Sequence, residues 1–461
     1  MSGAVAMQSK PTGAVEEYVG QYADLRASLP GAGLPWLASL RDAAAARFQA
    51  QGLPTSAIEA WKFTHLDRLA KQIYAPHAAP AAVPVTAEQI AHFRFAGLCE
   101  ILLVFVDGQF RADLSDPQLA DAGALPAGLS VQSFAGALAA APDLVRDHLA
   151  GPEADPAQAL AALNLALAAD GAVIRLSAGT KLGQPLHLLF LTGSFAGQAN
   201  HVRNLIVADA GAEATVVETY AALPGVSGNA WTNVVTQVSG AEDSIIRHFK
   251  VQNEGLENTH TSISDVTLAT KARYDSFSLA AGAALARHEV RAKLTGDHAA
   301  ATLNGVYLGR GRQHQAQRTD VMHLARDTSL SEVYKGVLDG RSHGAFLGRV
   351  HVAPGAGGTD AQQSNRNLLL SDHAVADSKP ELEIYADDVK CAHGATVGDL
   401  DREPLFYLRA RGVGEAEARA LLIEAFAGEL IDRIADEPVH AHFRNVLSHW
   451  LQQGVAQGNP S

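Results

Sequence analysis

The sequence predicts a mainly β protein whose strands stack into a solenoid, with helices at both ends. Between residues 172 and 400, short β-type runs start roughly 13 to 17 residues apart, so that two strands make a repeat of about 30. Asn-Gly and Asp-Gly pairs that would close β-hairpins are few, and small residues recur before the strands, where a coil turns its corners. These observations favour a stacked β-helix, in which each coil is buried against its neighbours. A β-sandwich of similar strands stays open at this point.

The region before the strands is predicted to be mainly helical. Residues 34–51 are rich in Ala, Leu and Arg, which are good helix formers, and residues 141–170 return to a helical composition. Between them, residues 75–84 form a linker rich in Pro and Ala, and residues 100–106 form a buried strand that runs into a tight turn at Asp107-Gly108. We therefore expect an N-terminal, mainly helical region over residues 1–170.

The β-helix core is expected over residues 171–400. Polar and apolar residues alternate clearly in residues 245–251, as expected for a strand with one buried face. The runs that indicate strands are Ala214–Tyr220, Trp231–Val238, Ser244–Val251, Ser262–Leu268, Tyr274–Leu279, His288–Leu294, Thr302–Leu308, Gln317–His323, Leu330–Leu338, Ala345–Val352, Asn365–Leu370 and Leu382–Tyr385.

Residues 401–461 are predicted to form a C-terminal helical domain. Glu415 and Glu417 are placed in a first turn, where acidic side chains suit the helix dipole. One apolar stripe follows with a spacing of four residues, made of Leu422, Phe426, Leu430 and Ile434. A second helix is indicated by Phe443, Val446, Leu447, Trp450 and Leu451.

Composition excludes several classes of function. The formal net charge of −13 argues against a nucleic-acid surface, which needs clustered Lys and Arg. Two cysteines far apart, Cys99 and Cys391, make a disulfide framework unexpected and indicate a reducing compartment. Cys99, next to the strand at residues 100–106, is expected to be a buried structural thiol. No secretory signal and no apolar run long enough for a membrane span are visible, so we expect a cytoplasmic protein.

One cluster of residues is suited to metal chemistry, while the usual catalytic motifs are missing. The sequence has no phosphate-binding Gly-x-x-x-x-Gly-Lys-Ser/Thr motif, so we expect no ATP site in this chain. If residues 389–394 are extended, Cys391 and His393 point to the same face, as a thiol and an imidazole that could hold a metal. The alternative is that Cys391 packs as a small apolar residue and His393 is simply solvated.

Two ligands cannot complete a metal or cluster site. Tetrahedral zinc and iron–sulfur clusters ordinarily take about four protein ligands. If Cys391 and His393 bind iron or a cluster, further ligands must come from another chain. The remaining histidines of the predicted core are expected to be exposed or hydrogen bonded.

Four segments make the chain resemble the SufD family of the SUF iron–sulfur cluster assembly system. The longest and most specific is residues 380–398, and residues 362–370, 405–412 and 59–64 resemble the same family. The related SufB family shares the fold, but SufB-like chains carry a cysteine where residues 363–368 have none. They also lack the Val-Lys-Cys-x-His-Gly segment. The resemblance therefore favours SufD over a SufB-like scaffold.

This resemblance implies a right-handed parallel β-helix that acts as a non-catalytic scaffold. It implies a heterodimer with SufB through the edge of the β-helix, a homodimer when alone, and a C-terminal domain that docks the SufC ATPase. Iron or a nascent cluster would be shared with SufB at His393, with Cys391 beside it, and reduced flavin is associated with the complex without assignable residues here. The candidate docking residues are Phe406, Tyr407, Arg409, Arg411, Leu422, Phe426 and Leu430.

A carbohydrate-active β-helix enzyme is the alternative from a different class. Such enzymes place several acidic residues on one face of the solenoid for acid–base catalysis. Acidic residues are sparse through residues 260–350 and form no evident ladder. The scaffold is therefore the favoured interpretation.

Overall fold

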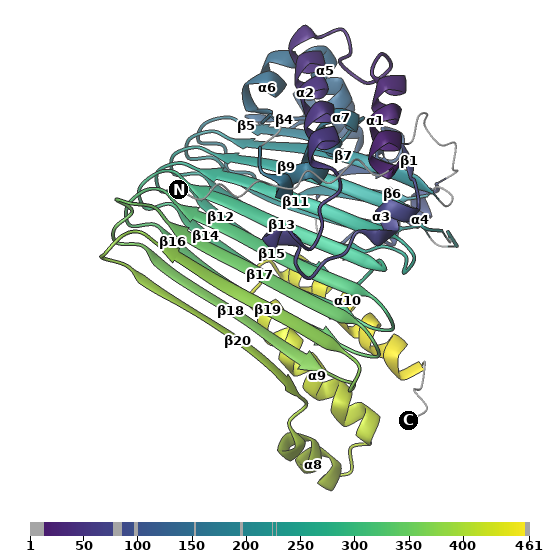
Figure 1. The fold of residues 1–461 in the computed structure, drawn as a ribbon, viewed down its shortest axis with the longest axis vertical. Coiled ribbons are helices and arrows are strands. Elements are labelled where there is room, and N and C mark those ends of the chain that lie inside the picture. The colour runs from purple at the N-terminus through teal and green to yellow at the C-terminus, as the bar shows by residue number, and fades with distance from the viewer. Residues whose placement is uncertain are drawn as a thin grey trace.

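The computed structural model describes residues 13–76, 85–95, 100–151, 154–193, 197–223, 225–226 and 228–456. Within these residues, the strands form two ten-stranded sheets that face each other along a solenoid (Figure 1). Cys99 and most of the expected linker lie outside the described residues. Among the described residues, no helix is long and apolar enough to span a membrane.

Consecutive strands of the core alternate between the two sheets, so each strand pairs with the strand two further along the chain. The first sheet contains, in spatial order, β19 (Val375–Ile384), β17 (His343–Val352), β15 (His314–His323), β13 (Leu285–Leu294), β11 (Thr259–Leu268), β9 (Trp231–Gly240), β7 (Gln198–Ala208), β5 (Ala172–Leu176) and β4 (Leu129–Ser133), with β1 (Ala75–Pro76) beside β7. The second contains β20 (Lys390–Asp399), β18 (Asp360–Leu369), β16 (Ser329–Leu338), β14 (Ala300–Gly309), β12 (Arg273–Ala280), β10 (Ile245–Asn253), β8 (Glu213–Ala222), β6 (Leu186–Thr192), β2 (Ile101–Val106) and β3 (Gln109–Phe110).

The pairing confirms the predicted parallel β-solenoid and excludes the sandwich. From β5 and β6 onward every described strand pair is parallel, and the register runs without interruption over ten residues in pairs such as β14–β16 and β18–β20. The expected strand at residues 100–106 is β2, which turns back at Asp107-Gly108 into β3, the antiparallel partner of β2. Both turn residues have positive φ, at 50° and 75°, as a tight hairpin turn requires.

One corner of the solenoid is built from a repeated left-handed turn. The corner residue of each coil donates its backbone N–H to a carbonyl of the next coil, with N–O distances of 2.7 to 3.0 Å. A positive φ at each corner aims these N–H groups along the solenoid axis, and Asp and Gly tolerate that conformation best. The residues concerned are Asp243, Lys271, His298, Asp327 and Gly358, with φ between 54° and 77°.

The interior between the sheets is the main hydrophobic core. At its N-terminal end, Phe105, Phe190 and Tyr220 stack in successive coils, with ring centroids 4.6 and 4.8 Å apart. Equivalent residues lie above one another in parallel strands with matched register, so each ring covers the next.

Helices cover the outer faces of both sheets. The N-terminal helices lie over the first coils of the first sheet, where Tyr18 and Phe48 pack with Trp231 (Figure 1). These helices are α1 (Gly13–Leu25), α2 (Pro35–Gln51), α3 (Asp67–Lys71), α5 (Phe134–Ala140), α6 (Pro142–His148) and α7 (Ala159–Leu167). The short helix α4 (Ala87–Ala91) instead packs Ile90 against β2 and β6 of the second sheet. Short 3-10 turns lie at Glu59–Trp61, Pro117–Ala120, Ala122–Ala124 and Pro156–Gln158.

The three C-terminal helices are α8 (Arg402–Ala410), α9 (Glu415–Ile431) and α10 (Glu437–Ala456). Of these, α9 and α10 pack on the outer face of the second sheet, whereas α8 contacts α9. Phe443 of α10 packs edge-on against Phe249 and Phe277 of the sheet, with centroids 6.2 and 5.3 Å apart. Glu415 and Glu417 lie in the first turn of α9, as expected. The division of the chain at residues 170 and 400 stays a prediction, and β1 to β4 from before residue 171 join the two sheets.

Candidate functional site: the open end of the solenoid

The C-terminal end of the solenoid is an open coil made of β19 and β20. Each of these strands has a strand neighbour on one side within the described chain, so its other edge has no strand beside it. Ordered strand edges of this kind present unpaired N–H and C=O groups and readily accept another chain. Large apolar side chains are exposed at this end, namely Val375, Ile384, Tyr385 and Val397, which are 40 to 61% exposed.

The structure places Cys391 and His393 on β20, with both side chains on the inward face. Cys391 is in register with Ala361 and His393 with Gln363, and both of these β18 residues are buried in the interior. Cys391 is half-buried and packs against the end of the main core. His393, two residues further along the strand, is exposed at the open end. The strand thus aligns a thiol and an imidazole at the mouth of the solenoid.

The surroundings of Cys391 favour its neutral thiol form. Burial raises the pKa of Cys391, which the backbone hydrogen bond from Ala361 only partly offsets. A raised pKa favours the neutral thiol, whereas metal binding and nucleophilic attack need the thiolate.

No group of three or more His, Cys, Asp or Glu side chains suited to a metal ion occurs among the described residues. Cys391 and His393 supply two donor side chains, fewer than the usual four. That further ligands come from a second chain stays a prediction.

A second surface lies where the C-terminal helices extend away from the solenoid. Phe406 and Tyr407 of α8 are 74 and 56% exposed and line an open groove of about 910 Å³ together with Leu422 of α9. Arg411 lies 4.7 Å from the ring centroid of Tyr407, and Arg409 forms an ion pair of 3.2 Å with Glu415. Exposed aromatic residues flanked by arginines are typical of protein-binding surfaces.

The remaining candidate docking residues lie closer to the solenoid. Phe426 is half-buried, and Leu430 is fully buried in the core between α9, α10 and the second sheet. The buried face of α9 is completed by Ile423 and Ile431. The apolar stripe predicted from the sequence thus runs from the exposed groove at Leu422 to the packed core at Leu430.

A network of charged side chains is buried in the interior, and no pattern in the sequence predicted it. Glu218 accepts hydrogen bonds from Thr236 (2.6 Å) and Tyr220 (2.9 Å), while His248 and Lys250 lie 3.3 and 3.9 Å from its oxygens. Burial by itself would raise the pKa of Glu218, but these charges and hydrogen bonds lower it well below its usual value. Burial also lowers the pKa of Lys250 to about 8. A buried acid of this kind needs such partners to stay ionised.

The N-terminal arm, residues 59–64, crosses the outer face of the first sheet and reaches the open coil. Thr64 contacts His314 (Oγ1–Nε2, 3.1 Å), whose Nδ1 is 3.1 Å from Nδ1 of His343, and His343 contacts Asp377 of β19 at 2.7 Å. Glu59 forms an ion pair with Lys379 of the same strand. The contacts of Thr64 and Glu59 join positions 250 and 320 residues apart, which explains why the sequence could not reveal them.

Acidic side chains on this outer face are paired with arginines. Arg318 binds both Glu289 and Asp320, and Arg349 also binds Asp320 at 2.9 Å. A carbohydrate-cleaving site needs two carboxylates that face each other across a substrate. These carboxylates instead form part of an ion-pair network.

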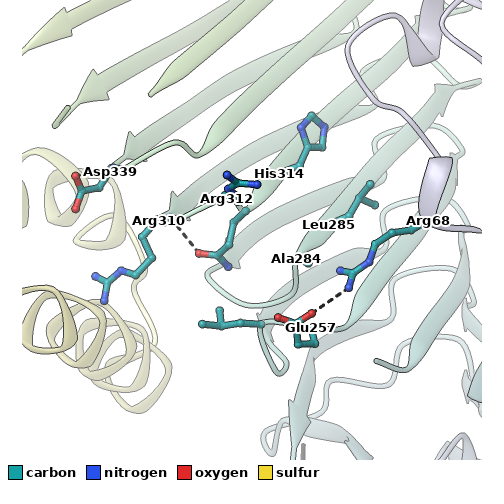
Figure 2. A pocket seen from close by; sticks show the side chains of 12 residues that line it. Arg68, Glu257, Ala284, Leu285, Arg310, Arg312, His314 and Asp339 are labelled. Carbon is teal, nitrogen blue, oxygen red and sulfur yellow. Dashed lines mark hydrogen bonds and ion pairs between the residues drawn. The ribbon is translucent and has the colours of Figure 1, made fainter. Parts of the chain in front are cut away.

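A hollow of about 670 Å³ is lined by Arg68 of α3 and by residues at the ends of the strands and in the loops that join them (Figure 2). Its arginines do not converge on one point. Arg68 is paired with Glu257 at 3.1 Å, and Arg310 turns away to donate to the carbonyl of Trp450. Arg312 is exposed at the centre of the view. One guanidinium without a second converging group does not define a binding site.

Comparison with known proteins agrees with this architecture. The family model for the SUF system FeS cluster assembly SufBD core domain matches residues 190–426, and the model for the SufBD protein N-terminal region matches residues 12–188. The iron–sulfur cluster assembly protein SufD of Escherichia coli is 32% identical over 390 residues, covering 84% of this chain and 86% of that protein.

Two further relatives extend the comparison. An iron–sulfur cluster assembly SufBD family protein of Synechocystis is 30% identical over 422 residues, covering 89% of this chain and 90% of the relative. The chloroplastic protein ABCI7 of Arabidopsis thaliana is 28% identical over 285 residues, covering 60% of each chain. The solenoid with its open terminal coil is thus that of an iron–sulfur cluster assembly protein of the SUF system. The chain belongs to the SufB/SufD superfamily and is SufD-like.

Proposed function

We propose that this chain is a non-catalytic scaffold subunit that pairs with SufB through the open coil and docks the SufC ATPase on its C-terminal helices. The observation that carries the proposal is the half-site on β20. His393 and Cys391 point into the open end of the solenoid, where the described chain supplies no third ligand. A partner strand laid beside β20 would bring its own side chains to the same place.

In this proposal, iron or a nascent iron–sulfur cluster is the cargo held between His393 and a partner thiol. ATP is bound and hydrolysed by SufC and not by this chain. Reduced flavin remains an expectation for the complex as a whole, and we assign it no residue here. The same edge would serve a homodimer when the chain is alone.

The C-terminal helices are suited to transmit movement from the ATPase to the open coil. The groove at Phe406 and Tyr407 is where SufC would dock, and it lies directly after β20 in the chain. A second groove, lined by Thr396 and Val397 of β20 and by Phe426 of α9, joins the two regions. Displacement of α8 and α9 would therefore act on the strand that carries His393.

The test is to co-express the chain with SufB and SufC and to measure iron and acid-labile sulfide in the isolated complex. We expect all three proteins to co-purify, and His393→Ala to preserve the complex and its circular dichroism spectrum while abolishing cluster assembly. His373→Ala, which removes an exposed histidine from the loop before β19, is the matched control. Normal cluster content with His393→Ala would refute the site, and a chain that purifies alone would refute the scaffold role.

A further inference from the structure

Three side chains on neighbouring strands form a column that leads from the interior to His393. Glu332 on β16 is in register with Gln363 on β18, which is in register with His393 on β20. Residues in register on parallel strands point to the same side of the sheet. Glu332 and Gln363 are 1 and 4% exposed, so this side is the interior of the solenoid.

The amide of Gln363 is held in one orientation. Its Nε2 donates to Oε2 of Glu332 at 3.2 Å, and Oε1 of Glu332 accepts from Thr319 Oγ1 at 2.6 Å. The space for this amide exists because residue 348, across the interior, is glycine: a Cβ at Gly348 would lie 2.1 Å from Nε2 of Gln363. Because the NH2 group of Gln363 donates to Glu332, the carbonyl oxygen of the same amide points away from Glu332.

That carbonyl oxygen is buried and has no hydrogen-bond partner within the part of the chain that the structure describes. Buried amide oxygens nearly always have a donor. The next residue in the column is His393, one strand spacing away, and a neutral imidazole carries one N–H donor and one nitrogen lone pair.

We propose that Gln363 is a positioning residue for His393, whose ring N–H donates to Gln363 Oε1 so that the other ring nitrogen faces the open end of the solenoid. This inference rests on the proposed role of His393 as a ligand. Metal-binding histidines commonly donate their second ring N–H to a carbonyl or carboxylate, which fixes both the tautomer and the direction of the lone pair. Gln363 supplies such an acceptor, and Glu332 fixes its orientation.

The first measurement is Co²⁺ binding by the isolated complex under anaerobic conditions, followed by absorbance. We expect Gln363→Leu to weaken Co²⁺ binding by roughly 10- to 100-fold, the usual effect of losing a hydrogen bond to a metal-binding histidine. Gln363→Glu keeps an acceptor oxygen in place and is expected to restore binding. Gln362→Leu is the matched control, because Gln362 is exposed on the opposite face of the same strand.

The second measurement is the tautomer of His393 in the full-length chain, by long-range ¹H–¹⁵N correlation at pH 8. Burial raises the pKa of Glu332 to about 7, so its carboxylate accepts from Gln363 at this pH. We expect one dominant tautomer in the wild type and in Gln363→Glu, and a mixture in Gln363→Leu. A role confined to core packing would leave the tautomer unchanged.

The outcomes separate this inference from the proposed function. If His393→Ala abolishes Co²⁺ binding while Gln363→Leu has the affinity and tautomer of the wild type, the positioning role is wrong and the ligand role stands. If His393→Ala binds Co²⁺ normally, the proposed function itself fails. Gln363→Asn, which withdraws the amide by one methylene, replaces the leucine variant if that variant does not fold, and it is expected to show the same loss.

Discussion

The ammonium group of Lys335, on the outer face of β16, donates a hydrogen bond of 2.7 Å to the backbone carbonyl of Phe426 on α9. The same group donates to Glu429 at 2.6 Å and lies 4.8 Å from the centroid of the Phe426 ring. Lys335 is 1% exposed, whereas its partner Glu429 is 56% exposed, so the lysine end of the contact is buried and the carboxylate end faces water. One side chain thus ties the helix next to the docking groove to the solenoid.

Substitution of Lys335 should weaken the docking of α9 on the second sheet without affecting the strands of the solenoid. Lys335→Met keeps the aliphatic stem but removes the charged donor, and we expect a loss of about 2 kcal/mol in the stability of the helix docking. Hydrogen exchange should become faster in residues 418–434 and stay unchanged in β12 and β14. Arg433→Met is the control, because Arg433 reaches the same Glu429 from the surface at 3.9 Å. Equal exchange in wild type and Lys335→Met would show that the tie contributes nothing.

The buried Glu332 should make the stability of the solenoid depend on pH. Burial raises its pKa to about 7, against an ordinary value of 4.5. The folded state therefore favours the protonated form, and this contribution is complete below pH 4.5 and is lost as the pH rises through 7. A pKa difference of this size corresponds to about 3 kcal/mol.

Glu332→Gln should remove this dependence. We expect the free energy of unfolding of the wild type to fall between pH 5 and pH 8 relative to that of Glu332→Gln, measured by urea denaturation. Glu417→Gln, which changes an exposed acid on α9, should follow the wild type across the same range. Parallel curves for wild type and Glu332→Gln would contradict the raised pKa.

The fold could be predicted from the sequence where burial imposes a pattern, and not elsewhere. Residues 245–251 alternate because Phe249 and Val251 pack beneath the C-terminal helices, while His248 and Lys250 point into the interior between the sheets. By contrast, β20 at residues 390–399 is mostly exposed and shows no such alternation. Glu218 and Lys250 are charged residues at interior positions, where the apolar pattern would not place them. They are tolerated there because their opposite charges lie 3.9 Å apart. Strand alternation alone predicts that Cys391 and His393 lie on the same face. The position of Gln363 beside His393 follows only from the register of β18 with β20, which the sequence does not reveal.

The docking surface on α8 should respond to loss of one aromatic side chain. Phe406 is 74% exposed and lines the groove. We expect Phe406→Ser to raise the dissociation constant for the SufC subunit by at least about tenfold, because aromatic residues at the centre of interfaces commonly contribute this much. Isothermal titration calorimetry provides the measurement. Leu256→Ser is the control: it removes a leucine that is 55% exposed on a distant loop, and it should leave the affinity for SufC unchanged. If both variants bind equally well, the groove is not the docking site.

The free edge of β20 allows pairing to be tested separately from folding. The N–H of Lys390 donates to Thr359 O beside β18 at 2.8 Å, and N–H directions alternate along a strand. The N–H of Ala395 therefore faces the open edge, where proline is tolerated within a chain but cannot donate to a partner strand. We expect Ala395→Pro to melt like the wild type and to lose the SufB subunit on size-exclusion chromatography.

Ala395→Ser is the matched control, since it changes the side chain and keeps the N–H. It should retain the partner, because strand pairing depends on the backbone donor and not on a small side chain at the rim. If Ala395→Pro retains the partner with the affinity of the wild type, the second chain does not extend the sheet at β20. His393 would then have to meet its partner ligand across side-chain contacts alone, and the geometry of the shared site would differ from the one proposed here.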